Sequence, residues 1–523
     1  MPPGPQFAPP FTALTGVDRM FLEAAHGWRS GDYQKVVEIL QRAHRLYPEH
    51  EKVLIELGFA HAMSYDFDAA EQCFEKAIRI SPSKTDTLLA VGHQWRRVRH
   101  YEAAKNCFER ILQQSQVPII TFLRLAEIYE RQRCMEDAVE MVERALKLDG
   151  ADGGALFTRA QIYRQMKQLD EAEKLLRSIL VNSSYASLHL GAWYELGTIL
   201  DQRGCYDEAM AAFLRAKTLA PAEAASAAKY ATQLRTRQAS LKQIQATISE
   251  NMVQRWRTAG QSELQPSRKL AMLCGHARSG TTLLEYVLDS HPQITSADET
   301  FVFSNKAYFA LCRSNSAPPP VLPTLDSISA RNLRQIRTDY FRGMESFLGE
   351  LIGERLLIDK NPGLTSDIPA CVRFFPESKF LVALRDPRDV CLSCFMQPAR
   401  MNPDSSSWLS LEGTIDNYAS IMNFWLALKP LVGAAAIEVR YEDMVEDLEA
   451  NARRVLGFLG FTWDERVLKF NEHTRNKIVR SPTYAEVSKP IYKGAVGRWR
   501  NYQRHLEPYQ DKLAPLISAF GYE

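Results

Sequence analysis

Residues 275–282 read GHARSGTT, and this stretch decides the fold of the second half of the chain. It nearly matches the phosphate-binding loop G-x-x-x-x-G-K-[S/T], but Thr281 stands at the lysine position. An apolar run, 269–274, precedes it, and a run with helical spacing, 281–290, follows it. A strand, a tight loop and a helix N-terminus in this order direct backbone N–H groups at an anion. The stretch therefore predicts an α/β, P-loop-like domain with a parallel sheet.

The missing lysine restricts the anion. In nucleotide triphosphatases that lysine clamps the β- and γ-phosphates, so its absence disfavours a triphosphate. Arg278 instead places a planar, charged guanidinium inside the loop, which suits a single tetrahedral group. Thr281 and Thr282 add hydroxyl donors. A kinase or triphosphatase is thus a disfavoured alternative.

Two later stretches carry further basic residues. Residues 379–394, KFLVALRDPRDVCLSC, predict a buried strand ending at Arg385 and a helix carrying Ser393. These two side chains could bind a second phosphate, well away from the first, or Arg385 could form an ordinary strand-end salt bridge. Residues 492–502, YKGAVGRWRNY, form a Lys-Gly-x-x-Gly loop that contains Lys493 and Gly494.

The first half of the chain is a repeat. Aromatic or large apolar residues recur at intervals of 34, 34, 34, 34 and 37 residues, and a small or β-branched residue follows each by three positions. The repeated positions are Tyr33, Phe67, Tyr101, Met135, Leu169 and Tyr206. Spacings of three and four place such residues on one helix face. The pattern resembles the tetratricopeptide repeat, with six helical hairpins over residues 18–221.

A solenoid of such repeats implies a groove that holds a protein or peptide. The alternative is that the array only orients the second half or dimerises.

The length of the chain predicts more than one domain. Its 523 residues exceed one hydrophobic core, which stops growing at roughly 250–300 residues. We expect a disordered tail at 1–17, the solenoid at 18–221, a helical extension and linker at 222–262, and the α/β domain at 263–523. The helical extension is expected to end near Gly260.

Composition and sequence patterns predict the cellular location and the absence of membrane, nucleic-acid and metal partners. We find no secretory signal and no apolar run of about 18 residues, so we expect a cytoplasmic protein without a membrane partner. The net charge of +2 does not indicate nucleic-acid binding. Nine scattered cysteines predict reduced thiols, and the lone pair Cys391 and Cys394 lacks the further ligands of a zinc site, so no metal is expected.

The three basic stretches together resemble sulfotransferases that use 3′-phosphoadenosine 5′-phosphosulfate. Other segments resemble tyrosylprotein sulfotransferases, namely RSGTTLLEYVLDSHPQI with the following ADET, LIDKNPGLTSDIPACVRFFPESKFLVALRD, and VRYEDMVEDLEANARRVLGFLGFTW. The resemblance covers residues 268–502. Repeats placed ahead of such a domain also resemble a bacterial class of repeat-containing sulfotransferases.

The resemblance implies roles for individual residues. The 5′-phosphosulfate would be bound by Arg278, Ser279, Gly280, Thr281 and Thr282. The 3′-phosphate would be bound by Arg385 and Ser393, with further nucleotide contacts from Thr483, Lys489, Lys493 and Gly494. Glu299 would be the general base for the acceptor, with Asp298 as its rival. Lys360 would stabilise the leaving oxygen, and Arg278 the transferring group.

These implications predict a sulfotransferase, and the catalytic stretches favour a peptidyl tyrosine as acceptor. A carbohydrate or small-molecule hydroxyl is the first alternative. The second is a non-catalytic repeat scaffold with a nucleotide-sensing domain. The sequence does not indicate the oligomeric state.

Overall fold

The structure is a computed structural model that describes residues 15–220, 224–264, 266–308, 321–398, 402–475 and 493–523. The chain divides into two compact units. The first contains residues up to 128 together with 301–318 and 336–351. The second contains 129–300, 319–335 and 352–523. The predicted tail lies outside the described residues up to residue 14, and the first helix already begins at Gly16.

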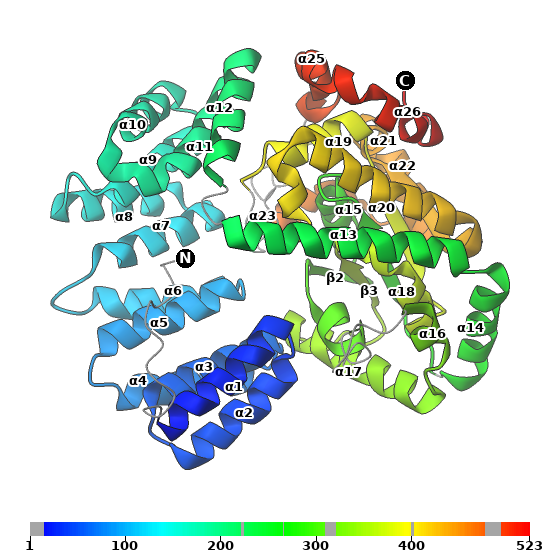
Figure 1. Ribbon diagram of the computed structural model, residues 1–523, viewed down its shortest axis with the longest axis horizontal. Coiled ribbons are helices and arrows are strands. Elements are labelled where there is room, and N and C mark those ends of the chain that lie inside the picture. Colours follow the sequence, from blue (N-terminus) through cyan, green and yellow to red (C-terminus); the bar gives the residue numbers. More distant parts are fainter. Residues whose placement is uncertain (1–14, 221–223, 265, 309–320, 399–401, 476–492) are drawn as a thin grey trace. The chain divides into compact units, whose positions relative to one another are not determined.

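Helical hairpins make up the described part of the chain up to residue 219 (Figure 1). The helices are α1 (Gly16–Ser30), α2 (Tyr33–Leu46), α3 (Glu51–Met63), α4 (Phe67–Ile80), α5 (Lys84–Arg97), α6 (Tyr101–Leu112), α7 (Ile119–Gln132), α8 (Met135–Leu148), α9 (Gly153–Gln165), α10 (Leu169–Val181), α11 (His189–Gln202) and α12 (Tyr206–Leu219). Each of the six repeated positions is the first residue of an even-numbered helix. The residues three positions later are fully buried, as close helix packing requires.

The turn inside each hairpin needs a left-handed residue two positions before the even-numbered helix. Glycine fills this position in the first and last hairpins, at Gly31 and Gly204. The other four turns use non-glycine residues with φ between 60° and 66°, namely Tyr65, Arg99, Arg133 and Lys167. The longer interval of 37 residues also has a local cause, since a 3₁₀ segment, η2 (Ser183–Leu188), is inserted between α10 and α11.

In the first unit the turn at Tyr65 packs against later parts of the chain. The Phe301 amide donates to Tyr65 Oη over 2.6 Å, and the rings of Tyr65 and Phe347 meet edge to face at 5.6 Å. Phe301 lies two residues before η4 (Phe303–Tyr308), and Phe347 lies at the end of α17 (Ala330–Leu348).

The second unit contains a five-stranded parallel sheet of order β2-β3-β1-β4-β5. The strands are β1 (Leu270–Gly275), β2 (Ile294–Asp298), β3 (Leu356–Lys360), β4 (Lys379–Leu384) and β5 (Ala436–Arg440). Four of them are buried along nearly their whole length, as expected for a parallel sheet covered on both faces. The predicted fold class, a helical repeat region followed by an α/β domain with a parallel sheet, is confirmed.

One face of the sheet packs on α15 (Thr281–Asp289) and α22 (Leu448–Leu459) in a single apolar core. The alternate strand residues, among them Met272 and Phe380, are buried on the opposite face. Within the described residues the remaining helices are α13 (Ala224–Thr247), α14 (Glu250–Glu263), α16 (Val321–Asp326), α18 (Ile368–Phe374), α19 (Pro387–Phe395), α20 (Leu411–Val432), α21 (Tyr441–Glu446), α23 (Phe470–Arg475), α25 (Gln503–Leu506) and α26 (Gln510–Ala519). Short 3₁₀ segments are η5 (Pro362–Asp367), η6 (Ser405–Leu409), η7 (Gly433–Ala435), η8 (Glu465–Lys469), η9 (Lys493–Ala495), η10 (Arg498–Tyr502) and η11 (Glu507–Tyr509).

Helix α14 continues three residues past Gly260, where the sequence suggested its end. Gly260 is buried, and a Cβ atom there would lie 2.1 Å from Pro376 Cγ. This glycine therefore permits close packing and does not terminate the helix.

Candidate active site

The loop after β1 is built on left-handed backbone. Arg278 has φ of 70°, and Gly280, which directly precedes α15, has φ of 86°. The Gly275 amide donates to Thr365 Oγ1 over 2.7 Å, which fixes the start of the loop to η5. Gly280 has no side chain that could cap α15, so the first helical amides point their N–H groups toward whatever lies at this end. The loop therefore has the backbone geometry of an anion site.

The hydroxyl residues predicted for the loop are buried. Ser279, Thr281 and Thr282 are 2%, 4% and 7% exposed. Gly280 lies against an aromatic ring, since a Cβ atom there would be 2.6 Å from Tyr441 Cδ2. A glycine is thus required at this point by both its φ angle and its neighbour.

Arg278 connects the first basic stretch to the second. Its Nε donates to Ser393 Oγ over 3.0 Å, although the sequence placed Ser393 in a separate phosphate site. Arg385, which directly follows β4, donates from Nη1 to the Arg278 carbonyl over 3.4 Å and from Nη2 to the Ala495 carbonyl. Its guanidinium also lies 5.0 Å from the centre of the Tyr441 ring. The structure therefore brings Arg278, Ser393 and Arg385 into one cluster.

The third basic stretch reaches the same cluster through its backbone. Lys493 and Gly494 belong to η9, and the carbonyl of Ala495 accepts from Arg385 as described above. Thr483 and Lys489 lie outside the described residues, so their predicted nucleotide contacts stay predictions.

The two predicted catalytic side chains meet at the ends of neighbouring strands. Lys360 ends β3, and Glu299 directly follows β2. Lys360 Nζ lies 3.2 Å from Glu299 Oε1, 2.5 Å from Asp298 Oδ1 and 3.5 Å from Glu285 Oε2. The lysine side chain is 0% exposed, so its charge is balanced within the protein by three carboxyl groups.

The geometry separates Glu299 from its rival Asp298. The Asp298 side chain is 10% exposed and makes the shortest contact with Lys360, whereas the Glu299 side chain is 26% exposed. Glu299 has φ of 48°, and its amide donates to the Lys360 carbonyl over 2.8 Å. Of the two carboxylates, Glu299 is therefore the one that a molecule from solvent reaches more easily.

The electrostatics of this cluster keep the lysine charged. Burial alone would lower the pKa of Lys360, but Asp298, Glu285 and Glu299 outweigh it and the pKa is raised above its ordinary value. Burial raises the pKa of the Glu285 carboxyl well above its ordinary value, and Lys360 only partly opposes this effect. The cluster thus presents a charged lysine beside a partly exposed carboxylate.

Glu285 is a part of the cluster that the sequence reasoning missed. It lies in α15, is 0% exposed and accepts a hydrogen bond of 3.0 Å from Ser296 Oγ. The available signal was an acidic residue in the middle of the helical run TTLLEYVLDS, flanked on both sides by apolar residues. Such a residue is almost never fully buried unless it is paired.

The described residues contain no group of three or more His, Cys, Asp or Glu side chains arranged to hold a metal ion. The eight cysteines within the described ranges are free, including Cys391 and Cys394 in α19. None of the described helices combines the length and apolar character that crossing a bilayer requires. A cavity beside α26 is lined by other residues, and no residue predicted for the site is among them.

Comparisons with known proteins agree with this architecture. Residues 271–465 match the model of a sulfotransferase family, and residues 53–84, 123–187 and 157–224 match models of the tetratricopeptide repeat. The chain therefore carries tetratricopeptide repeats and, after them, a sulfotransferase domain. The sequence-based prediction of this combination is confirmed.

Two relatives illustrate the range of similarity. An uncharacterized protein of Aquifex aeolicus is 24% identical over 355 residues, which cover 62% of this chain and 44% of the relative. Protein-tyrosine sulfotransferase 2 of Gallus gallus is 25% identical over 287 residues, which cover 49% of this chain and 69% of the relative. The chain thus spans less than half the length of the first relative and about two thirds of the second.

Solved structures resemble each half. The sulfotransferase domain of the Synechococcus PCC 7002 olefin synthase is 22% identical, with 49% of this chain and 96% of that chain covered and a TM-score of 0.37. A TPR protein described as having an unusual peptide-binding site is 19% identical, with 36% and 94% covered and a TM-score of 0.26.

Proposed function

We propose that this protein is a sulfotransferase that moves a sulfo group from 3′-phosphoadenosine 5′-phosphosulfate to the hydroxyl of a peptidyl tyrosine. The observation that carries the proposal is the pairing of buried Lys360 with the partly exposed Glu299, 3.2 Å apart, inside the segment that matches the sulfotransferase family. A charge-stabilising cation and a general base are the two groups that transfer to a hydroxyl needs.

The residues around Arg278 fit the donor. Arg385 is 8% exposed, and its Nε has no hydrogen-bond partner among the described residues. A buried donor without a partner is costly, and a phosphate oxygen would satisfy it. The amides at the start of α15 and the hydroxyls of Ser279, Thr281 and Thr282 would hold the phosphosulfate end. Arg385 and Ser393 would hold the 3′-phosphate.

The donor, when bound, supplies a sulfuryl group whose bond to a phosphate oxygen breaks as the acceptor oxygen bonds to sulfur. Glu299 then accepts the proton of the acceptor hydroxyl. Lys360 keeps its positive charge because its pKa is raised, and this charge stabilises the oxygen on which negative charge develops. Asp298 and Glu285 hold the ammonium in place and leave Glu299 as the carboxylate that meets the acceptor.

The acceptor is inferred from two features. Several relatives at 24–26% identity are named protein-tyrosine sulfotransferases, and the repeats offer a surface of the kind that holds peptides. We propose that the repeats bind the acceptor protein or another protein partner. We also propose that the protein acts in the cytoplasm.

The test is to incubate the protein with ³⁵S-labelled donor and a panel of tyrosine peptides, glycans and simple phenols. We expect label on tyrosine peptides and none on the same peptides with phenylalanine in place of tyrosine. Label on glycans or on phenols alone would replace the peptide acceptor by the carbohydrate or small-molecule alternative. Binding of 3′,5′-adenosine bisphosphate without any transfer would favour a nucleotide-sensing scaffold.

A further inference from the structure

Asp389 is a buried carboxylate that the proposed chemistry does not use. It lies in α19, four residues after Arg385 and four residues before Ser393. Residues four apart lie on the same face of a helix, so Asp389 and Ser393 share one face of α19, whereas Arg385 precedes the helix. Its side chain is 0% exposed.

Both carboxylate oxygens of Asp389 are occupied by the third basic stretch. Oδ2 accepts from the Gly497 amide and Oδ1 accepts from the Trp499 amide, each over 2.8 Å. Gly497 has φ of 68°, a left-handed conformation that suits glycine. One side chain therefore ties the backbone of 497–499 to the helix that carries Ser393.

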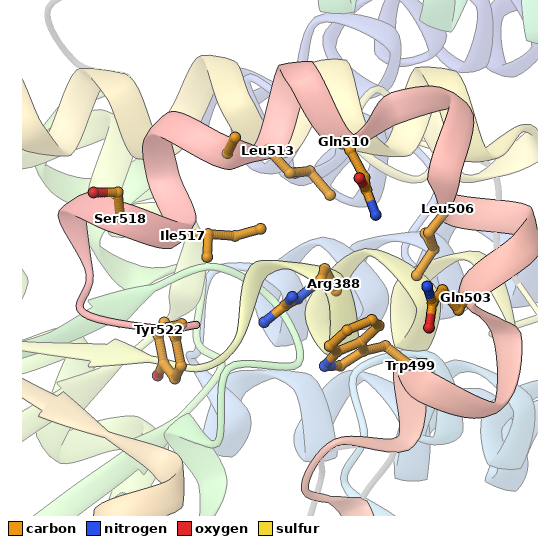
Figure 2. Close-up of a pocket in the computed structure, with 10 residues that line it drawn as sticks. Arg388, Trp499, Gln503, Leu506, Gln510, Leu513, Ile517, Ser518 and Tyr522 are labelled. Carbon is orange, nitrogen blue, oxygen red and sulfur yellow. The ribbon is translucent and has the colours of Figure 1, made fainter.

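A second contact joins the same two elements. The guanidinium of Arg388 lies 3.7 Å from the centre of the Trp499 ring, and Figure 2 shows these two side chains beside each other. This contact holds the side chain of Trp499, whereas Asp389 holds its backbone. The attachment of the segment to α19 thus involves both backbone and side chain.

Asp389 also faces Arg385. Its Oδ2 lies 3.7 Å from Arg385 Nη2, and that same Nη2 donates to the carbonyl of Ala495, two residues before Gly497. The carboxylate balances the arginine charge at a distance too long for a hydrogen bond. Both of these contacts involve Nη2, and Arg385 Nε has no hydrogen-bond partner among the described residues.

We propose that Asp389 is a positioning residue for donor selectivity: it fixes residues 495–499 against α19 and thereby orients Arg385 toward the 3′-phosphate. The inference rests on the proposed function, because it assumes a donor with a 3′-phosphate. Asp389 itself touches no substrate in this account. Its effect passes through Arg385 and the backbone of the segment.

The test uses Asp389→Asn in the full chain. Asparagine has a single acceptor oxygen, and its NH₂ group would face one of the two amides, so one of the two ties is lost. The readout is the ratio of the dissociation constants of 5′-ADP and 3′,5′-adenosine bisphosphate, measured by calorimetry. We expect the wild type to prefer the bisphosphate, and the variant to lose about tenfold or more of that preference.

Two further variants make the outcome decisive. Asp447→Asn removes another carboxylate that accepts a backbone amide, that of Ala450 at 3.0 Å, at the exposed start of α22, and should leave the preference unchanged. Gly497→Ala displaces the same segment without altering Asp389, and should also lose the preference for the bisphosphate. This variant tests the inference even if Asp389→Asn does not fold.

The failures are distinguishable. If both ligands weaken equally in Asp389→Asn and in Gly497→Ala, Asp389 has only a structural role and the inference is wrong. If the wild type itself does not prefer the bisphosphate, the proposed donor is wrong.

Discussion

Replacing Lys360 by methionine tests the candidate site most directly. The substitution keeps the length of the side chain and removes its charge. Three carboxylates lie within 3.5 Å of the Nζ atom, and the side chain is 0% exposed. Removing one partner of a buried ion pair costs about 3–5 kcal/mol. Since a native protein is stable by about 5–15 kcal/mol, the variant should fold, with an unfolding midpoint lowered on the order of 10 °C.

The catalytic loss should be separate from this loss of stability. Removing one group that stabilises developing charge typically lowers turnover about 10²–10³-fold. The affinity for 3′,5′-adenosine bisphosphate should change little, because the residues proposed to bind it are elsewhere. The raised pKa of Lys360 gives the wild-type ammonium its stabilising effect below the unfolded pKa, and the effect is lost only as pH rises through the folded pKa. The stability difference should therefore be fully present at neutral pH.

The measurements are ³⁵S transfer at saturating donor, calorimetric binding and thermal unfolding. Lys429→Met is the control, since Lys429 forms an ion pair of 2.7 Å with Glu438 but its side chain is 47% exposed. Such exposed pairs contribute about 0–1 kcal/mol. A folded Lys360→Met protein that transfers sulfate as fast as the wild type would refute the role of the lysine.

Three further substitutions test other parts of the structure. Glu299→Gln should lower turnover about 10²–10⁴-fold with nucleotide binding retained, as expected for a general base, and a larger effect from Asp298→Asn in a folded protein would reverse the assignment. Arg385→Ala should weaken binding of 3′,5′-adenosine bisphosphate by about 1.5–3 kcal/mol in calorimetry, and unchanged affinity would remove the arginine from the site. Ala104→Leu should lower the free energy of unfolding of the repeats by about 1–3 kcal/mol in denaturant, because Ala104 is 0% exposed and the larger side chain would overpack the core. The control is Glu102→Leu on the exposed face of the same helix, which should have little effect. Equal effects of the two substitutions would contradict the packing described.

The sequence was sufficient to predict the repeats because their pattern is periodic. Each of the six repeated positions is the first residue of a helix, so the period read from the sequence gives the starts of all six helices. The strand, loop and helix around Arg278 were predictable for a similar reason, since an apolar run, glycines and a helical run follow one another without a gap.

What the sequence could not predict depends on contacts between distant residues. Gly260 suggested a helix end from local rules, but its role is set by Pro376. Glu285 contacts Lys360 only because α15 passes beside the end of β3 in the folded domain. Likewise, the contact of Arg278 with Ser393 joins residues that are 115 positions apart. Local propensity carries no information on such pairs.

The strand order divides the chemistry of the domain into two halves. Glu299 and Lys360 stand at the ends of β2 and β3, whereas Arg278 and Arg385 follow β1 and β4, which are the next two strands in the sheet. Under the proposed function, the groups that act on the reacting atoms therefore stand at one pair of strand ends, and the groups that bind the nucleotide stand at the other. A change in the nucleotide contacts after β1 and β4 would then alter donor binding and leave the Glu299–Lys360 pair in place.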